Sequence, residues 1–430
     1  MKNIDFMQKD LKFNWHPCTQ MKDHEFLPLI PIKKAKGVYL EDFEGNKYID
    51  SISSWWVNIF GHQNRYINKA IKKQLKKLEH IIFAGFTHKG AVKLSKRLCK
   101  ITKMDKVFYG DNGSSAVEIA LKMAYHYYLN KGENRKLFFS LENSYHGETL
   151  GALSVGDVAL YKETYNPLLI KSIQLPIPKD VSDKETTKAL KKCKVLFEKH
   201  HKNVSSLIIE PLVQCAGNMK MHSPKFVKGL RELCDKFDIK LILDEIAVGF
   251  GRTGTMFGHF QAGIKGDFLC LSKGLTGGYL PLSCVLTTDE IYQEFYCDYT
   301  KLKAFLHSHS YTANPLSIAC ANAVLDIFEK KDILKKNEKK SKYIWDKIQK
   351  FKNLKNVKEI RQTGMITAIE MIDYPFEKRA GLEVYKYGLK NGVLLRPLGN
   401  VIYFMPPYTI KYKEIDKMIE VAFEGIKSLI

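Results

Sequence analysis

Leu241-Ile242-Leu243-Asp244 and Phe268-Leu269-Cys270-Leu271-Ser272-Lys273 are the two segments that decide the fold. Each contains a short apolar run and ends at a charged residue. Similar runs alternate with amphipathic segments such as 115–130 and 225–237. The further runs that predict buried strands are Val107-Phe108-Tyr109, Leu137-Phe138-Phe139, Leu207-Ile208-Ile209 and Cys284-Val285-Leu286. This alternation predicts an α/β fold with a mostly parallel central sheet and helices on both faces.

Asp244 and Lys273 are the first candidates for chemistry. The carboxyl ends of parallel strands meet at one edge of a sheet, where ligands bind, so we expect this carboxylate and amine in one crevice. A structural ion pair is one explanation. Pyridoxal 5′-phosphate (PLP) is another, because its pyridine nitrogen needs an acidic partner and its aldehyde needs a lysine. The glycines in Gly274-Leu275-Thr276-Gly277-Gly278 favour PLP, since they let the backbone approach a flat ring.

A second feature is the turn Gly110-Asp111-Asn112-Gly113-Ser114, which follows a predicted strand and opens a predicted helix. Ser115 and Glu118 have the spacing of a capping box at that helix. Gly113 and Ser114 could offer N–H groups and a hydroxyl to a phosphate at the helix N-terminus. An ordinary helix cap is the alternative explanation.

Tyr145 lies in Asn143-Ser144-Tyr145-His146-Gly147-Glu148-Thr149, directly after the next predicted strand. At this position it could cover a flat ring, although an exposed loop aromatic would look the same. Glu210 ends another strand and could line the same site. Asp267 precedes the Lys273 strand, so we expect it to cap or to form a turn.

Trp55 and Trp56 make up half of the chain's 4 Trp. They predict either a core aromatic pair or a wall that covers a substrate. Arg396 follows the apolar run Val393-Leu394-Leu395. It is a candidate clamp for a carboxylate, with a surface salt bridge as the alternative.

The net charge of +22 raises the possibility of a basic nucleic-acid-binding protein. Only 8 of the 68 basic residues are Arg, the side chain favoured for phosphates and base edges. Lysines such as those in 71–78 are spread along predicted helices, which indicates a solvated surface. No nucleic-acid partner is expected.

Cellular location is predicted from three features. The 9 Cys are scattered without a Cys-x-x-Cys pair, which favours reduced thiols and no metal site. Residues 1–7 lack the apolar core of a signal peptide. No apolar run has the length of a membrane helix. We therefore expect a cytoplasmic protein with no membrane partner.

The chain is long enough for more than one domain. We expect 1–50 to be an N-terminal segment of a small α+β domain, 51–330 to be a large cofactor-binding domain and 331–430 to complete the small domain. Residues 37–50 predict a hairpin around Glu44-Gly45-Asn46. The elements predicted in the C-terminal part are helices at 334–351 and 380–391, a helix from about 412, and strands at 365–369, 393–396 and 401–405.

The longer stretches around the first two segments resemble the class III (ω-type) aminotransferases of PLP fold type I. They are Leu243-Asp244-Glu245-Ile246-Ala247-Val248-Gly249-Phe250-Gly251-Arg252-Thr253-Gly254 and Ser272-Lys273-Gly274-Leu275-Thr276-Gly277-Gly278. The resemblance runs along nearly the whole chain. It implies that Lys273 is the Schiff-base lysine and that Asp244 is the partner of the pyridinium. It also implies that Gly113 and Ser114 bind the phosphate and that Tyr145 stacks over the ring.

Other stretches resemble the aminotransferases of biotin biosynthesis within this class. They are Trp15-His16-Pro17-Cys18-Thr19-Gln20-Met21, Ser53-Ser54-Trp55-Trp56, 143–149, Arg396-Pro397-Leu398-Gly399 and Tyr403-Phe404-Met405-Pro406-Pro407-Tyr408. The resemblance implies amination of 8-amino-7-oxononanoate to 7,8-diaminononanoate, with S-adenosylmethionine the usual donor. It also implies a homodimer whose active sites lie at the subunit interface.

The same resemblance implies a substrate site. Trp55 would touch the substrate and Arg396 would hold the carboxylate of the keto acid. Residues 308–310 would approach from the neighbouring subunit, with Ser308 near substrate and His309 and Ser310 near phosphate. The remaining residues that it places at the substrate are Cys18, Trp56, Tyr145, Lys273 and Tyr403.

The chain departs from the family pattern at two places. Cys18 stands where the family often has Tyr, in a segment that lines the donor site. Ser308-His309-Ser310 stands where the family often has Gly-Pro-Thr. Some related enzymes with similar changes use lysine, so both donors are open. Class III enzymes acting on ornithine, acetylornithine, 4-aminobutyrate or glutamate semialdehyde are the alternatives, and their short polar substrates have less use for an aromatic wall.

Overall fold

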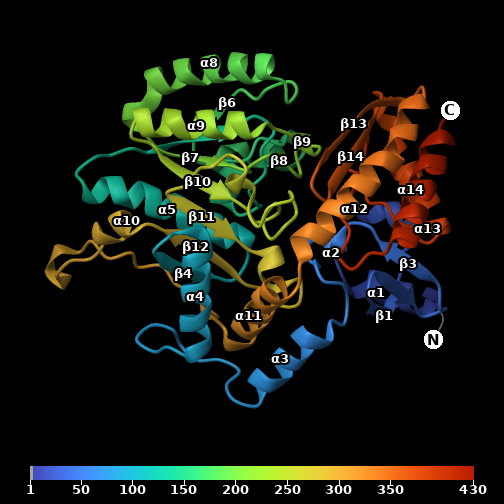
Figure 1. The fold of residues 1–430 in the computed structure, drawn as a ribbon, viewed down its shortest axis with the longest axis horizontal. Helices are drawn as coiled ribbons and strands as arrows, with labels where there is room; N and C mark the ends of the chain where they lie inside the picture. Colours follow the sequence, from blue (N-terminus) through green and yellow to red (C-terminus); the bar gives the residue numbers. More distant parts are fainter. Residues whose placement is uncertain (1–2) are drawn as a thin grey trace. The chain divides into compact units, whose positions relative to one another are not determined.

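The structure is a computed structural model that describes residues 3–430. The described chain forms two compact units. Unit 1 comprises residues up to 65 together with 340–361 and 367–430, and unit 2 comprises 66–339 and 362–366. The α/β architecture and its mixed, mostly parallel sheet confirm the predicted fold class (Figure 1). The domain boundaries expected near residues 50 and 330 stay a prediction.

Unit 2 is built on a seven-stranded sheet with the order β4-β12-β11-β10-β7-β5-β6. Only β12 runs antiparallel to its neighbours β11 and β4. Strands β7, β10 and β11 are fully buried, which explains their continuous apolar sequences. The strands are β4 (Lys106–Gly110), β5 (Leu137–Leu141), β6 (Ser172–Leu175), β7 (Val204–Ile209), β10 (Lys240–Asp244), β11 (Phe268–Leu271) and β12 (Ser283–Thr287).

Helices cover this sheet. α5 packs against β4, β7, β10, β11 and β12, whereas α9 packs against β10 and α8 (Figure 1). α9 begins where Ser223 caps the N–H of Phe226 and Pro224 occupies the first turn, as helix-start rules predict. The helices of this unit are α3 (Arg65–Leu75), α4 (Lys89–Thr102), α5 (Gly113–Asn130), α6 (Leu150–Ser154), α7 (Ala159–Lys162), α8 (Asp183–His200), α9 (Pro224–Lys236), α10 (Asp289–Gln293) and α11 (Pro315–Lys330). A short antiparallel ribbon, β8 (Val213–Gln214) with β9 (Lys220–Met221), completes it.

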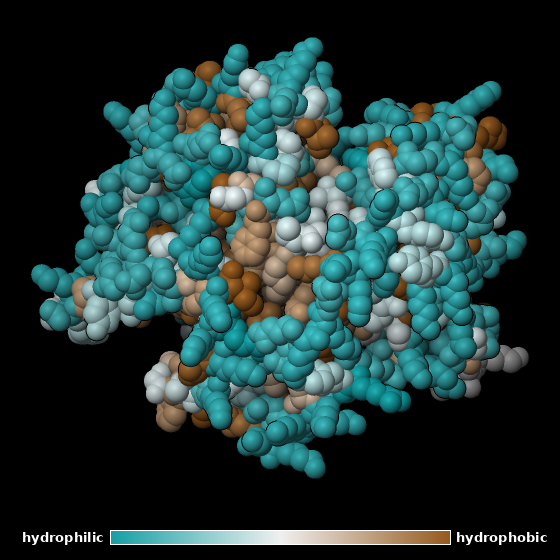
Figure 2. All heavy atoms as spheres, viewed as in Figure 1, coloured by the Kyte–Doolittle hydropathy of each residue, from teal (hydrophilic) through white to brown (hydrophobic). Residues whose placement is uncertain are grey.

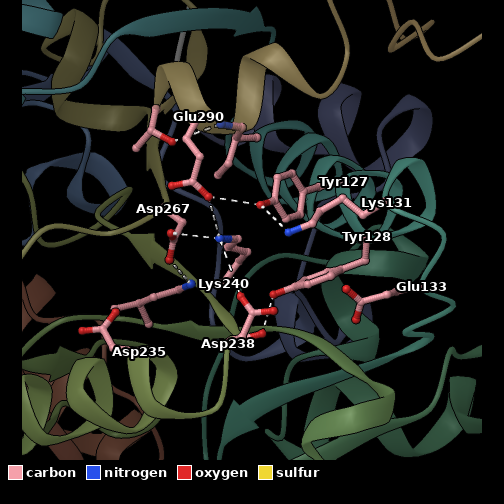
Figure 3. Close-up of polar contacts among 12 residues, drawn as sticks. Tyr127, Tyr128, Lys131, Glu133, Asp235, Asp238, Lys240, Asp267 and Glu290 are labelled. Carbon is pink, nitrogen blue, oxygen red and sulfur yellow. Dashed lines mark hydrogen bonds and ion pairs between the residues drawn. The ribbon is translucent and has the colours of Figure 1, made fainter.

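A polar network closes the amino end of the central strands (Figure 3). Lys240, the first residue of β10, pairs with Glu290 at 3.3 Å and lies 4.7 Å from the ring centre of Tyr127. The Tyr127 hydroxyl also donates to Glu290, at 3.1 Å. Asp267 accepts a 2.7 Å hydrogen bond from the N–H of Leu241. Asp267 therefore anchors the start of β10, as expected for a residue with a structural role.

Unit 1 contains two small sheets, with the orders β1-β2-β3-β15 and β13-β14-β16. β2 and β3 pair antiparallel, which confirms the predicted hairpin. β15 joins this sheet parallel to β3. The strands are β1 (Ile32–Lys36), β2 (Tyr39–Asp42), β3 (Lys47–Asp50), β13 (Val357–Thr363), β14 (Ile366–Met371), β15 (Val393–Leu394) and β16 (Val401–Phe404). The helices are α1 (Asn3–Phe13), α2 (Ser53–Trp56), α13 (Ala380–Lys390) and α14 (Tyr412–Lys427), and α12 (Ile333–Ile348) contributes its second half.

The surface is largely hydrophilic on the face seen in Figure 2. Helix α8 illustrates why, because its buried residues are only Thr186, Ala189, Cys193 and Phe197, while its lysines lie outside that stripe. Among the helices described for residues 3–430, none combines the length and the hydrophobicity that a membrane span requires.

Candidate active site

Asp244 lies at the carboxyl end of β10 and is almost completely buried. Its Oδ2 lies 2.7 Å from Nδ1 of His146, and its Oδ1 accepts from the N–H of Ile246 at 3.1 Å. His146 is also buried, and its Nε2 has no partner among the described residues. These contacts assign the ring proton to Nδ1, so the imidazole donates to the carboxylate. The carboxylate of Asp244 is thereby held in one orientation.

Lys273 lies two residues after the end of β11, which pairs in parallel with β10. Burial lowers the pKa of Lys273 below its ordinary value, and the positive charge of Arg252 lowers it further. The nearby acidic groups of Cys215, Asp244 and Glu210 oppose that shift. The parallel register thus brings the predicted carboxylate and amine into one electrostatic environment.

Glu210 follows β7 and is buried beside Asp244. Its carboxylate accepts hydrogen bonds from the N–H groups of Tyr145 and Cys215, at 3.1 and 3.0 Å. Burial raises the pKa of Glu210 to about 7, and the charge of Asp244 adds to the rise. Glu210 therefore ties the Tyr145 loop to the strand ends, as a residue lining the site would.

Tyr145 is half-buried, with its hydroxyl 3.0 Å from Glu148 and its ring 5.5 Å from that of Tyr161. It lies one residue before His146, which contacts Asp244. The loop 143–149 therefore reaches the same strand ends as Asp244. Stacking of Tyr145 over a bound ring stays a prediction.

Gly113 and Ser114 form the first turn of α5. The capping box predicted at Ser115 and Glu118 is wrong, because Asn112 caps the helix by accepting from the N–H of Ser115 at 3.0 Å. Glu118 instead accepts from the N–H groups at the start of α6. The helix begins three residues earlier than the box required, so Gly113 and Ser114 stand at its open N-terminal end.

Ser114 is closely enclosed by the Tyr145 loop. Its hydroxyl accepts from the N–H of Glu148 at 3.3 Å. A Cβ on Gly147, which has φ of +127°, would lie 2.0 Å from Ser114 Oγ. The loop can approach the N-terminus of α5 only because residue 147 has no side chain. Gly147 was not singled out in the sequence, although it lies within the stretch that carries the resemblance.

Residues 308–310 lie beside the end of strand β4 in their own chain. His309 Nδ1 is 3.5 Å from Asp111 Oδ2, and His309 Nε2 is 3.1 Å from His307 Nε2. Ser308 and Ser310 are exposed. Their expected approach to a neighbouring subunit stays a prediction.

Unit 1 holds the predicted substrate residues. Trp55 is 42% exposed, and the guanidinium of Arg396 lies 4.8 Å from its ring centre. Both residues line a cavity of about 340 Å³ whose other walls are largely apolar, including Leu29, Leu40 and Leu394. In the part of the chain that the structure describes, no acidic side chain lines this cavity. A cationic group in an apolar trough is suited to an anion that carries a hydrocarbon chain.

Trp56 and Tyr403 are buried in the same unit. The Trp56 Nε1 donates to the Tyr403 hydroxyl at 3.0 Å, and the rings meet edge to face. Trp56 therefore belongs to the core, but its aromatic partner is Tyr403 and not Trp55, which is exposed. Cys18 is exposed. Direct contact of Trp56, Tyr403 or Cys18 with substrate stays a prediction.

Comparison with known proteins identifies the family. The aminotransferase class-III family matches residues 20–425 of this chain.

The chain is a class-III aminotransferase. One relative is the adenosylmethionine-8-amino-7-oxononanoate aminotransferase of Helicobacter pylori, 54% identical over 98% of this chain and 97% of the relative. The enzyme of that name from Geobacter sulfurreducens is 42% identical over 96% and 95% of the two chains. A crystal structure of the enzyme of that name from Methanocaldococcus jannaschii has a TM-score of 0.95 and 38% identity over 99% of both chains. An amine transaminase from an uncultivated Pseudomonas species, solved in its PLP-bound form, has a TM-score of 0.90 and 30% identity over 97% and 98% of the chains.

Class-III aminotransferases are PLP enzymes, so PLP is the cofactor of this aminotransferase. The residues of unit 2 fit the group, because a buried carboxylate, a lysine amine and an open helix N-terminus lie at neighbouring strand ends. The close approach of Gly147 to Ser114 forms a cradle that a Cβ would fill. Sequence reasoning missed His146 as a site residue. The signal was its position directly after Tyr145, but nothing in the sequence reveals its partner.

Proposed function

We propose that this aminotransferase transfers an amino group to 8-amino-7-oxononanoate, forming 7,8-diaminononanoate in biotin biosynthesis. The observation that carries the proposal is the cavity of unit 1, which has an apolar wall, the Arg396 cation and no acidic lining residue within 3–430. The proposed acceptor has the matching chemistry, since it is a hydrocarbon chain that ends in a carboxylate. Relatives of that activity at 54% and 42% identity over nearly the whole chain support the assignment.

PLP, when bound, acts as an electron sink that allows the amino group to leave one substrate and join another. Lys273 is proposed to anchor the cofactor and then to carry the proton at the reacting carbon, a task that its lowered pKa favours. Asp244 is proposed to keep a proton on the pyridine nitrogen. His146 supports this task, because its hydrogen bond holds the carboxylate in place.

The phosphate is proposed to bind at Gly113 and Ser114, where the N-terminus of α5 favours an anion. Tyr145 is proposed to cover the ring. His309 and Ser310 are proposed to reach the phosphate, and Ser308 the substrate, of the second subunit in a homodimer. Large apolar side chains that are exposed in the single chain, such as Leu302 and Leu306, support an assembly with a partner.

The acceptor's carboxylate is proposed to bind Arg396, with Trp55 against its chain. Trp56 and Tyr403 are proposed to complete the aromatic wall, and Cys18 to line the donor site. The donor is proposed to be S-adenosylmethionine or lysine. A cytoplasmic location is proposed, in keeping with relatives that are named as biosynthetic aminotransferases.

The proposal is tested by incubating the purified, PLP-loaded protein with 8-amino-7-oxononanoate and each donor separately. Mass spectrometry should detect 7,8-diaminononanoate with at least one of the two donors. In parallel incubations, 8-amino-7-oxononanoate is replaced by the aldehydes that correspond to ornithine, acetylornithine and 4-aminobutyrate. Preferred turnover of these shorter acceptors would assign a different class-III activity to the chain.

A further inference from the structure

A left-handed turn carries Trp55. Ser53, Ser54, Trp55 and Trp56 have φ values of +53°, +45°, +72° and +70°, so all of α2 lies in the left-handed region. None of the four is Gly, the residue that adopts this conformation without strain. Strain of this kind persists only where the surrounding structure enforces it, and it often accompanies a functional site.

Asp50 is the residue that enforces the turn. It is the last residue of β3, and its side chain is fully buried. Its Oδ1 accepts from the N–H of Ser54 and its Oδ2 from the Ser54 hydroxyl, both at 2.7 Å. Oδ2 also lies 3.1 Å from Nε2 of His62. One carboxylate therefore grips both the backbone and the side chain of the residue before Trp55.

His62 is held in turn by the structure around it. Its backbone exchanges two hydrogen bonds with Gly37, at 3.0 and 2.7 Å. Asn58 Nδ2 lies 3.0 Å from His62 Nδ1. If Nδ1 accepts from Asn58, then Nε2 carries the hydrogen and donates to Asp50. Asp50, His62 and Asn58 thus form a continuous hydrogen-bonded chain beneath the turn.

Strand pairing connects this turn to Arg396. Asp50 of β3 is the parallel register partner of Leu394 in β15. Trp55 and Arg396 are therefore reached by the two chain segments that leave the same end of this strand pair. Their side chains meet, with the guanidinium 4.8 Å from the ring centre. A right-handed turn at 53–56 would direct the indole elsewhere and leave the guanidinium without this support.

We propose that Asp50, together with His62, is a positioning residue that holds the left-handed turn so that Trp55 orients Arg396 for the acceptor's carboxylate. This inference rests on the proposed function of the unit 1 cavity. Asp50 acts through the turn and touches no substrate itself. The left-handed conformation lets two successive tryptophans diverge, with Trp55 exposed toward Arg396 and Trp56 buried against Tyr403.

Two variants test the role of Asp50. Asp50→Asn keeps the shape but replaces one acceptor oxygen by a donor that faces His62. Ser54→Ala removes only one hydrogen bond at an exposed residue, so folding is preserved. We expect the KM for 8-amino-7-oxononanoate to rise about tenfold in Asp50→Asn and about threefold in Ser54→Ala, as for a weakened charged contact. The single-turnover rate of the donor half-reaction should stay within about twofold.

Asp267→Asn is the matched control. Asp267 is also a largely buried carboxylate that accepts a hydrogen bond from a backbone N–H at 2.7 Å. It belongs to the polar network at the amino end of the central strands of unit 2, opposite the carboxyl ends where Asp244 and Lys273 lie. This variant should lower the melting temperature and leave both half-reactions within about twofold of wild type. It separates loss of stability from loss of orientation.

A double-mutant cycle with Trp55→Ala shows whether Asp50 acts through the indole. In the Trp55→Ala background, Asp50→Asn should raise the acceptor KM by less than about twofold. The inference would be overturned if the effects of Asp50→Asn and Trp55→Ala on the acceptor KM simply multiplied in the double variant. It would also be overturned by equal losses in both half-reactions, or by an unchanged acceptor KM in both Asp50→Asn and Ser54→Ala.

A substrate-free measurement separates this inference from the proposed function. Acrylamide quenching of the tryptophan fluorescence is measured with and without the Trp55→Phe substitution. The difference between the two measurements isolates the emission of Trp55. Asp50→Asn should make that emission easier to quench, and unchanged quenching would refute the role of Asp50. If wild-type protein fails to aminate the acceptor while quenching changes as expected, the proposed function fails and the turn's dependence on Asp50 stands.

Discussion

Gly147→Ala is the change whose effect follows most directly from the structure. The new Cβ would lie 2.0 Å from Ser114 Oγ, 2.8 Å from Ser114 Cβ and 3.2 Å from Ser114 Cα. Contacts under 3.0 Å do not persist, so Ser114 or the loop 143–149 must move by about 1 Å. The φ of +127° adds backbone strain, because side-chain-bearing residues rarely adopt it. Both effects act on the proposed phosphate site.

The expected magnitude comes from the displacement of Ser114. If the protein relieves the overlap by moving Ser114, the hydrogen bond of this residue to the phosphate weakens, and a hydrogen bond to a charged group is worth roughly 1.5–3 kcal/mol. At about 1.4 kcal/mol for each factor of ten, the Kd for PLP should rise roughly 10- to 150-fold.

The assay titrates apoprotein with PLP and follows the visible absorption of the bound cofactor. Gly132→Ala is the control, because Gly132 also has a positive φ of +83° but no atom lies within 4 Å of the position that its new methyl group would occupy. The control should lose stability through backbone strain and bind PLP normally. If Gly147→Ala binds PLP within threefold of wild type, or if Gly132→Ala weakens binding equally, the cradle at Ser114 is not the phosphate site.

Four further predictions concern the site residues. Lys273→Ala should abolish transamination and leave the unfolding curve intact, and turnover near the wild-type rate would exclude its role as the cofactor's lysine. Asp244→Asn should lower kcat by on the order of 10²-fold or more, because Asn cannot hold the proton on the pyridine nitrogen; single-turnover rates within threefold of wild type would contradict this. Arg396→Ala should raise the acceptor KM by roughly 10- to 100-fold, about 1.5–3 kcal/mol for a charged hydrogen bond, and change the donor half-reaction less. Burial raises the pKa of Glu210 in the folded protein to about 7, so the folded state binds more protons than the unfolded state. The free energy of unfolding should therefore fall as pH rises from about 4.5 to 7. Glu210→Gln should flatten that part of a melting-temperature profile, and a slope equal to that of wild type would argue against the buried, protonated carboxyl.

Local sequence was sufficient for six of the seven strands in the unit 2 sheet and for its two central site residues, whereas strand β6 was not predicted. The apolar runs at 241–243 and 268–271 became β10 and β11, and Asp244 and Lys273 stand where those strands end. The hairpin at 37–50 was also predictable, because its turn residues and alternating strands lie within one short stretch. The predicted capping box failed because Asn112 and Ser115 offer competing caps only three residues apart, and local rules do not rank them reliably.

Tertiary structure alone decided the contacts that orient these residues. His146 meets Asp244 across the sheet, and no local pattern links positions separated by 98 residues. The left-handed turn at Ser53–Trp56 is stabilised by Asp50, by His62 and by the bond from Ser53 Oγ to the carbonyl of Met405, 352 residues away. Propensity favours right-handed backbone for Ser and Trp, so the turn exists only because distant hydrogen bonds outweigh that preference. The sequence by itself therefore determined which residues carry the chemistry, whereas the folded chain decided how each one is held, because hydrogen-bond partners are chosen in space and not along the chain.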